Sequence, residues 1–580
     1  MTSTRTEDIE RTMSDRVLVI CLDGATFDLL GPWMEAGDLP TLKRFMEEGV
    51  SGELESVIPP ITAPAWASFM TGKNPGKHGV YHFINRRASS AGPSFVSAAS
   101  RAGKVLWEWL SEDGKTVLVL NVPTTYPPQK VNGALISDFL TPPGKRDFTY
   151  PPSLVDELEE KFGPYPLHFK TLMFSANLSP SNARRLLDEA HRELRIKFDV
   201  AHYLWDRYES DFTIVHILGT DRLQHEFWNL LDSRHPLYDP SMSRRFRGAI
   251  RDYFVGVDAE IDRLCRKVGP EATTFIISDH GFGPAYKAID LNVWLLEQGY
   301  IHIKSEARSR LKFRLWKMGL TNERFIRLSL RTFFKYGAGL VERVPEESIF
   351  KSVRFFLQRG RRYPLFSLDD VDWSRTKAYA LVGMGAININ LEGREPAGSV
   401  KPGREYEALK QEIAEKLRAM TDPETGQRVN GRVYLREQVY EGPYVAQAPD
   451  IMFLPNERGY VAGSMMGFTS NRSIVPVPAW PGNHRQNGIL LARGRVLRKG
   501  QRLQGARLID LAPTLLYLMG SRVPRDMDGR ILTAMFEPDF VARRRVTYRD
   551  EEAVTSPVPH RGSEDEQQVI ERLKDLGYLM

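Results

Sequence analysis

The nine residues RVLVICLDG at positions 16–24 decide the fold class, because a short apolar strand runs into a turn that carries a carboxylate. Helical patterns lie at 152–162 and 181–206, and further helices are predicted at 405–420 and 508–519. Three more apolar runs have the same character: TVLVLN at 116–121, FTIVHIL at 212–218 and TTFII at 273–277. Apolar strands that alternate with long helices predict an α/β protein with a mostly parallel central sheet and helices on both faces.

Composition excludes several classes of protein. With 42% hydrophobic and 26% charged residues over 580 positions, the chain is neither disordered nor fibrous. A net charge of +6 is too small over this length to predict nucleic-acid binding. No run approaches the roughly 18 apolar residues that span a bilayer, and the polar start lacks the apolar core of a signal peptide. Since Cys21 and Cys265 are the only cysteines, we expect a reduced, cytoplasmic protein without a disulfide framework.

One segment is strongly basic. Between Lys304 and Arg362, sixteen Lys and Arg residues stand against five Asp and Glu residues, so this segment carries +11 and the remainder of the chain −5. The basic residues alternate with Leu, Phe and Trp at spacings of three and four, which favours short amphipathic helices. The simpler interpretation is a helical insertion with a solvated basic face. The alternative is a surface for anionic lipid or for a polyanionic substrate.

The chain is therefore expected to divide into consecutive parts around one core. These parts are a disordered N-terminus at 1–14, the first part of the core at 15–300, the basic helical insertion or cap at 301–370, the second part of the core at 371–535, and a polar C-terminal tail at 536–580 that offers a closing helix at 564–579.

Three aspartates lie where predicted strands end. Asp23, Asp221 and Asp279 each stand at or just past the C-terminal end of an apolar run. In open α/β sheets, ligands bind in the crevice at that end of the strands. Taken singly, an aspartate after a strand is more often a helix cap or a turn former.

Histidines accompany these aspartates. His280 follows Asp279 directly in SDHGFG, and His225 follows Asp221 by four residues, on one face of a helical turn. His484 lies in the glycine-rich stretch PGNHRQNG, which is expected to form a loop. Each pair alone is unremarkable, but together carboxylates and imidazoles at strand ends predict a site for divalent metal ions such as zinc or manganese.

The segment PPITAPAWASFMTG at 59–72 predicts a helix that begins near a hydroxyl. Thr62 is placed to cap this helix, and Pro64 lies in the first turn, where a missing N–H costs nothing. The simpler interpretation is an N-cap. The alternative is a nucleophile, because the helix N-terminus favours negative charge and a nearby metal ion would lower the pKa of the hydroxyl. The turn-rich loop at 72–79 is placed to close over a phosphate.

As a set, these segments resemble the type I phosphodiesterase/nucleotide pyrophosphatase family of the alkaline phosphatase superfamily. The resemblance covers roughly residues 15 to 535 and rests on six ordered motifs: VICLDG, PPITAPAWASFMTGKNPGKHGV, GTDRLQHEFW, ISDHGFG, GNHRQNGILLARG and DLAPTLLYLMGSRVPRDMDGR. It implies an alkaline-phosphatase-like core with two divalent metal ions, usually zinc in relatives and manganese as an alternative.

The resemblance also implies a role for each motif residue. One ion would be held by Asp221, His225 and His484, and the other by Asp23, Asp279 and His280. Thr62 would be the nucleophile and would bridge the metals. The implied reaction is in-line attack on phosphorus through a phosphothreonine intermediate, which water then hydrolyses.

The sequence also departs from the family pattern. Nucleotide pyrophosphatases of this family carry an asparagine shortly after the histidine-glycine of the nucleophile segment, whereas Phe83 stands at that place here. Asn85, Lys73 or Lys77 would then have to contact the substrate phosphate. The sulfatase branch needs Cys or Ser before Pro-Ser-Arg, and the alkaline phosphatase branch uses serine, so a threonine nucleophile favours the diesterases.

The expected function is a metal-dependent phosphohydrolase, with a phosphodiesterase favoured over a phosphatase. A headgroup transferase of the same fold and a non-catalytic metal-binding relative stay open as alternatives. The expected substrate is a phosphate-ester small molecule or a lipid-linked phosphodiester, with peripheral contact to an anionic membrane through residues 304–362.

Overall fold

The computed structural model describes two compact units. The described residues are 16–85, 94–167, 179–321, 365–380, 384–455, 459–463, 468, 470–476 and 480–550. Unit 1 comprises those within 1–286, 436–448 and 477–579, and unit 2 comprises those within 287–435 and 449–476. The predicted N-terminal segment 1–14, the closing helix at 564–579 and most of the basic segment lie outside the described residues.

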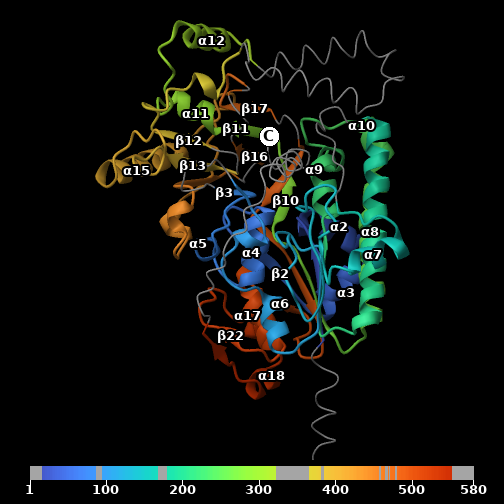
Figure 1. Ribbon diagram of the computed structural model, residues 1–580. Helices are drawn as coiled ribbons and strands as arrows, with labels where there is room; N and C mark the ends of the chain where they lie inside the picture. Colours follow the sequence, from blue (N-terminus) through green and yellow to red (C-terminus); the bar gives the residue numbers. More distant parts are fainter. Residues whose placement is uncertain are drawn as a thin grey trace, which may run out of the picture. The chain divides into compact units, whose positions relative to one another are not determined.

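Unit 1 is built on a ten-stranded mixed sheet, whose path runs β20-β2-β19-β9-β1-β8-β5-β6-β7 with β21 beside β2 (Figure 1). The strands are β1 (Val17–Leu22), β2 (Val50–Glu55), β5 (Val117–Leu120), β6 (Gly133–Ile136), β7 (Thr149–Tyr150), β8 (Phe212–Ile217), β9 (Thr273–Ile277), β19 (Asn487–Arg493), β20 (Gln501–Arg502) and β21 (Ala506–Arg507). The four strands predicted from apolar runs are all present, and they form adjacent parallel pairs β9-β1, β1-β8 and β8-β5. The predicted α/β fold is therefore confirmed, and β19 and β7 add antiparallel pairings.

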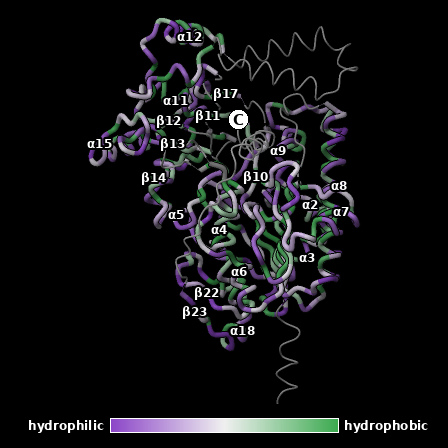
Figure 2. The backbone as a smooth tube through the Cα atoms, in the orientation of Figure 1, coloured by the Kyte–Doolittle hydropathy of each residue, from purple (hydrophilic) through white to green (hydrophobic). Residues whose placement is uncertain are grey.

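Helices pack on both faces of this sheet (Figure 1). They include α2 (Phe27–Ala36), α3 (Pro40–Glu48), α4 (Thr62–Thr71), α6 (Leu106–Glu112), α7 (Leu154–Phe162), α8 (Pro180–Tyr208), α9 (Gly219–Leu231), α10 (Pro240–Val268) and α17 (Leu511–Leu518). Side chains alternate along a strand, so Val17, Val19 and Cys21 of β1 join one core with α4, α6 and α17. Leu18 and Ile20, also fully buried, face the opposite layer. Figure 2 accordingly shows hydrophobic residues gathered on the central strands.

Unit 2 has its own core and is larger than the predicted insertion at 301–370. Its strands form a four-stranded sheet, β12-β13-β15-β14, and a three-stranded sheet, β16-β11-β17. The elements are β11 (Lys287–Asp290), α11 (Leu291–Glu297), α12 (Ala307–Lys317), β12 (Ala378–Ala380), β13 (Ala386–Ile389), α15 (Arg404–Arg418), β14 (Arg432–Leu435), β15 (Ile451–Leu454), β16 (Tyr460–Gly463) and β17 (Ile474–Pro476). Residues 371–435, which were expected in the main core, belong to unit 2.

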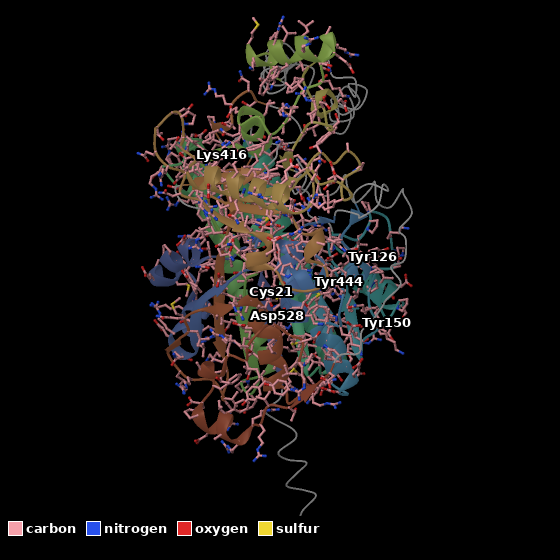
Figure 3. All side chains as sticks on the ribbon, turned by 90° about the vertical axis from the view of Figure 1, so that its left-hand side faces the viewer. Cys21, Tyr126, Tyr150, Lys416, Tyr444 and Asp528 are labelled. Atoms are coloured by element: carbon pink, nitrogen blue, oxygen red, sulfur yellow. The ribbon has the colours of Figure 1, made fainter. Side chains whose placement is uncertain are left out.

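The structure shows the state of the two cysteines and whether any helix could span a membrane. Both cysteines are free thiols, and Cys21 is fully buried on β1, where Figure 3 labels it in the interior of unit 1. Across the described ranges, no helix combines the length and the apolar character needed to cross a membrane.

The N-terminus of α3 is capped by a residue from another helix. Leu39 occupies the N-cap position and offers no side-chain hydrogen bond. Instead, the buried carboxylate of Asp258 on α10 accepts hydrogen bonds from the backbone N–H groups of Thr41, at 3.0 Å, and Leu42, at 2.8 Å. Because the first N–H groups of a helix have no partner within the helix, this contact ties α3 to α10.

We predict that Asp258→Ala lowers the free energy of unfolding by about 1–3 kcal/mol, since two buried N–H groups lose their acceptor. Chemical denaturation followed by circular dichroism measures the change. Asp252→Ala is the matched control on the same helix, because Asp252 is exposed and pairs with its neighbour Arg251. It should change stability by less than about 0.5 kcal/mol. Equal losses in both variants would contradict the capping role.

Candidate functional site

Parallel pairing brings three aspartates to one edge of the sheet of unit 1. Leu22 at the end of β1 pairs with Ile217 of β8, and Cys21 pairs with Ile277 of β9, so these strands end at one level. Asp23 and Asp279 follow β1 and β9, and Asp221 lies in the first turn of α9, after β8. All three carboxylates are completely buried.

The turn after β1 requires a glycine. Gly24 has a φ of +66°, and a Cβ atom at this position would meet Phe282 at 2.9 Å and Asp221 Oδ1 at 3.2 Å. Its backbone N–H donates to Asp279 Oδ1 at 3.2 Å. The Asp-Gly turn recognised in the sequence therefore lets the backbone approach the other two carboxylates closely.

Two histidines complete a cluster around Asp221. His225, on α9, donates from Nδ1 to the carbonyl of Gly482 at 3.0 Å, and His484 donates from Nδ1 to the carbonyl of Pro60 at 2.9 Å. A carbonyl oxygen only accepts, so each Nδ1 carries the hydrogen. The two Nε2 atoms lie 3.0 Å apart, and those of His225 and His484 lie 3.5 Å and 3.2 Å from Asp221 Oδ1.

The space between the Nε2 atoms of His225 and His484 suits a metal cation. Burial lowers the pKa of His225 to about 3, although Asp221 acts in the opposite direction. With the Nδ1 hydrogen of each ring donated to a carbonyl, the two Nε2 atoms face each other at 3.0 Å. Such a contact is repulsive unless a positive charge lies between the nitrogens, and neutral imidazole is the form that binds metal.

His280 has the same orientation on the other side of the site. Its Nδ1 donates to the carbonyl of Gly281 at 3.1 Å, so its Nε2 lone pair faces the carboxylates. Nε2 lies 3.3 Å from Asp279 Oδ2 and 3.6 Å from Asp23 Oδ1. Burial lowers the pKa of His280 to about 3, and the His280 ring stacks on that of His484 with centroids 3.7 Å apart.

The carboxylates have oxygens without donors. Within the described part of the chain, no hydrogen bond reaches Asp23 Oδ1, Asp279 Oδ2 or either carboxylate oxygen of Asp221. Burial and the neighbouring Asp23 raise the pKa of Asp279 well above its usual value. Burial also opposes ionisation of Asp221, but the positive charges nearby, that of Arg222 among them, outweigh it and hold the pKa of Asp221 far below the usual range. Buried acceptors without donors, beside imidazole lone pairs, form a donor set suited to divalent cations.

Two groups of these residues have ligand atoms within 4.8 Å of one another: Asp221 with His225 and His484, and Asp23 with Asp221 and His280. The first group is the one implied by the resemblance. In the second, Asp221 stands where the resemblance placed Asp279, so Asp221 is common to both groups.

Thr62 is the first residue of α4, and the N-cap position belongs to Ile61, which makes no side-chain cap hydrogen bond. The expectation that Thr62 caps the helix is therefore wrong by one position. The hydroxyl is fully buried and lies 3.4 Å from His280 Nε2. The hydroxyl thus stands at the positive end of the helix, next to the histidine and carboxylate cluster.

Two residues that sequence reasoning did not single out contact Asp23. Trp66 Nε1, one turn after Thr62 on α4, donates to Asp23 Oδ2 at 3.2 Å, and His216 Nε2 on β8 donates to the same oxygen at 2.7 Å. The signal for His216 was a polar residue within the apolar run FTIVHIL. Both donors occupy Oδ2, which leaves Oδ1 directed at the site.

The two lysines that were predicted to contact a substrate phosphate pair with acidic residues of the chain instead. Lys73 is buried, and its Nζ lies 2.5 Å from Asp526, so a substrate anion would have to compete with that carboxylate. Lys77 pairs with Asp528 at 2.6 Å. Asn85 ends the short strand β3 (Ile84–Asn85), and its side chain lies outside the described part of the structure. Phe83 is buried. The loop at 72–79 is thus tied to residues 526–528.

Comparisons with known proteins give one family and a set of solved structures. A family model described as type I phosphodiesterase/nucleotide pyrophosphatase matches residues 17–331. Human ectonucleotide pyrophosphatase/phosphodiesterase 5 is similar at 14% identity, with 87% of this chain and 95% of that chain covered and a TM-score of 0.42. Phosphonoacetate hydrolase from Sinorhizobium meliloti 1021 in complex with phosphonoformate is similar at 14% identity, covering 88% of this chain and 96% of that chain, with a TM-score of 0.46. No curated protein sequence matches the chain.

His78, close to the nucleophile segment, has a structural role. Its Nδ1 accepts from the N–H of Val80 at 3.2 Å, so its Nε2 carries the hydrogen and donates to Ser68 at 2.7 Å. Burial, with Arg101 and Lys73 nearby, lowers the pKa of His78 to about 3. Protonation at Nδ1 would break the bond to Val80.

This pKa shift predicts acid destabilisation. Between the ordinary histidine pKa of 6.5 and a pKa of about 3, the unfolded chain binds a proton at His78 and the folded chain does not. Stability is therefore lost as pH falls through this window, by up to about 1.4 kcal/mol per pH unit. In metal-free protein, His78→Gln should reduce the slope of unfolding free energy against pH between about 6 and 4. Denaturant titrations at several pH values measure both slopes, and equal slopes would contradict the assignment.

Proposed function

The chain belongs to the type I phosphodiesterase/nucleotide pyrophosphatase family, and from that membership we propose that it is a metal-dependent phosphodiesterase with Thr62 as its nucleophile. The family supports phosphoester hydrolysis and a requirement for metal. The observation that carries the finer proposal is the orientation of three histidines, whose Nε2 atoms converge on buried carboxylates beside the hydroxyl of Thr62.

Two metal ions are proposed, with zinc as the first choice and manganese as the second. Asp221, His225 and His484 would hold one ion. Asp23, Asp279 and His280 would hold the other, with Asp221 near enough to both to contribute to each. When bound, such ions lower the pKa of a nearby hydroxyl and stabilise negative charge on the attacking and leaving oxygens.

The residues of the chain have separate roles in the proposed reaction. Thr62 Oγ1 gives up its proton and attacks phosphorus, the bond between phosphorus and the leaving oxygen breaks, the leaving oxygen takes up a proton, and a phosphothreonine forms. Water then attacks this ester from the opposite side, restores the hydroxyl of Thr62 and releases the phosphate product. The N-terminus of α4 directs N–H groups toward the oxygens of the transferred group, and Trp66 and His216 hold Asp23 in place.

The substrate proposal is a phosphate ester outside the nucleotide diesters, because Phe83 stands where the nucleotide pyrophosphatases carry asparagine. A lipid-linked phosphodiester is the first choice and a water-soluble phosphate ester the second. The transferase and the non-catalytic alternatives differ from this proposal in a direct way: neither would hydrolyse a simple diester in water.

We predict that the protein with zinc or manganese hydrolyses bis-p-nitrophenyl phosphate faster than p-nitrophenyl phosphate, and that Thr62→Ala loses at least about 1000-fold in kcat. Thr62→Ser is the matched control, because it keeps the hydroxyl and should retain part of the activity. Release of p-nitrophenol measures all rates. Activity that survives in Thr62→Ala would refute the nucleophile, and faster monoester turnover would make the enzyme a phosphatase.

The two groups of ligands also predict how metal content changes. Wild-type protein should bind two zinc ions, His484→Ala should lose one, and Asp221→Ala should lose both or bind both more weakly by at least about tenfold, because Asp221 is common to the groups. Elemental analysis after dialysis and calorimetric titration measure the content and the affinity. An Asp221→Ala variant with one ion at unchanged affinity would instead assign the second site to Asp23, Asp279 and His280 alone.

A further inference from the structure

Helix α12 of unit 2 presents apolar side chains outward. Six large hydrophobic residues are exposed in the described part of the chain, and three of them, Leu311, Met318 and Leu320, lie within ten residues of one another on α12 and just after it. Their exposed fractions are 58%, 77% and 53%. A concentration of this kind usually marks an interaction surface.

Cations surround these apolar residues. Arg308, Arg310, Arg314 and Lys317 are all exposed on the same short helix. Lys312 pairs with Asp370, whereas the three arginines form no ion pair with another described residue. Between residues 304 and 321 there are six Lys and Arg residues and one acid, Glu306, which gives a net charge of +5.

Helical spacing places both kinds of residue on one face. Arg310, Arg314 and Met318 follow one another at intervals of four, and Leu311 and Met318 are seven apart, so these side chains are neighbours on the outer surface of α12. Figure 2 shows the hydrophilic and hydrophobic residues interleaved along this helix.

The opposite face anchors the helix. Trp316 is buried, donates from Nε1 to the carbonyl of Phe468 at 3.0 Å, and packs against the rings of Phe313 and Phe366. Ser309 donates to Asp370 at 2.8 Å. The fold of unit 2 therefore uses the inner face of α12, and the exposed apolar and basic residues do not contribute to the core.

We propose that this outer face of α12 binds the surface of an anionic lipid bilayer. A helix with exposed Leu and Met beside Arg and Lys lies in the interface plane, with apolar side chains at the acyl boundary and cations at the phosphates. A nucleic acid would use the cations but not Leu311 or Met318. The proposal deepens the proposed function by naming the partner that would supply a lipid-linked substrate, and only that consequence rests on the proposed function.

Sedimentation with vesicles tests the proposal on the full chain. Wild-type protein should bind mixed phosphatidylserine and phosphatidylcholine vesicles and not pure phosphatidylcholine. The variant Leu311→Ser/Met318→Ser/Leu320→Ser and the variant Arg310→Glu/Arg314→Glu should each reduce the partition coefficient by about tenfold or more. Circular dichroism and intrinsic tryptophan fluorescence check that both variants fold.

Arg244→Glu/Arg247→Glu on α10 is the matched control. It makes the same change of charge at exposed arginines of a helix whose hydrophobic residues are not among the exposed ones. It should leave vesicle binding unchanged within about twofold. Equal losses in this control would show general attraction of a cationic protein and would overturn the proposal. Wild-type protein that fails to bind anionic vesicles, or α12 variants that bind as well as wild type, would overturn it too.

Hydrolysis of bis-p-nitrophenyl phosphate separates this proposal from the proposed function. None of the α12 residues belongs to the metal and nucleophile cluster, so both α12 variants should hydrolyse this water-soluble diester at the wild-type rate. Vesicle binding by the inactive Thr62→Ala variant, at wild-type affinity, would support the surface even if the diester is not a substrate.

Discussion

Three hydrogen bonds from imidazole to backbone hold the centre of unit 1. The Nδ1 atoms of His225, His280 and His484 donate to the carbonyl groups of Gly482, Gly281 and Pro60. Each bond fixes the tautomer of one ring and turns its Nε2 lone pair into the same buried space as the carboxylates of Asp23, Asp221 and Asp279. Lone pairs and carboxylates that face one another away from water are costly, so the surrounding fold must hold them firmly.

Strand pairing and helix packing hold these residues in place. The three aspartates follow parallel strands whose ends are level, and α4 packs with β1 in the hydrophobic core on one face. His484 lies on β18 (Gly482–Arg485), which pairs with β10 (Gly281–Pro284), and His280 directly precedes β10. The site residues are far apart in the sequence, but the pairing of the strands brings them together.

Local patterns were enough to predict part of this site. The positions of Asp23 and Asp279 followed from the ends of apolar runs, and the shared face of Asp221 and His225 followed from helical spacing, because both are short-range properties. His484 was expected in a loop and lies on β18 instead, since its strand exists only through pairing with β10. The residues alone left the roles of His484 and Thr62 open, and the family resemblance assigned His484 to one ion and the nucleophilic attack to Thr62.

Long-range contacts explain the rest of what sequence reasoning missed. Trp66 and His216 meet at Asp23 from a helix and a strand that are distant in the chain. The separate sheet of unit 2 is built from strands of three or four residues, such as β12 and β13, whose hydrophobic patterns are too short to recognise. Lys73 and Lys77 have the right chemistry for phosphate, but the acids that engage them lie about 450 positions later.

Those two lysines bear on the choice between diester and monoester. With the two proposed cations bound, the carboxylates of the three aspartates and the alkoxide of Thr62 would carry four negative charges, which the cations would balance. Lys73 and Lys77 are engaged by Asp526 and Asp528, so neither adds free positive charge, and Arg222 already lies 3.4 Å from Asp221. A nearly neutral centre suits the single charge of a diester better than the two charges of a monoester, because each uncompensated charge in a buried site is expensive. With the two proposed ions in place, the electrostatics of unit 1 would therefore suit a diester better than a monoester.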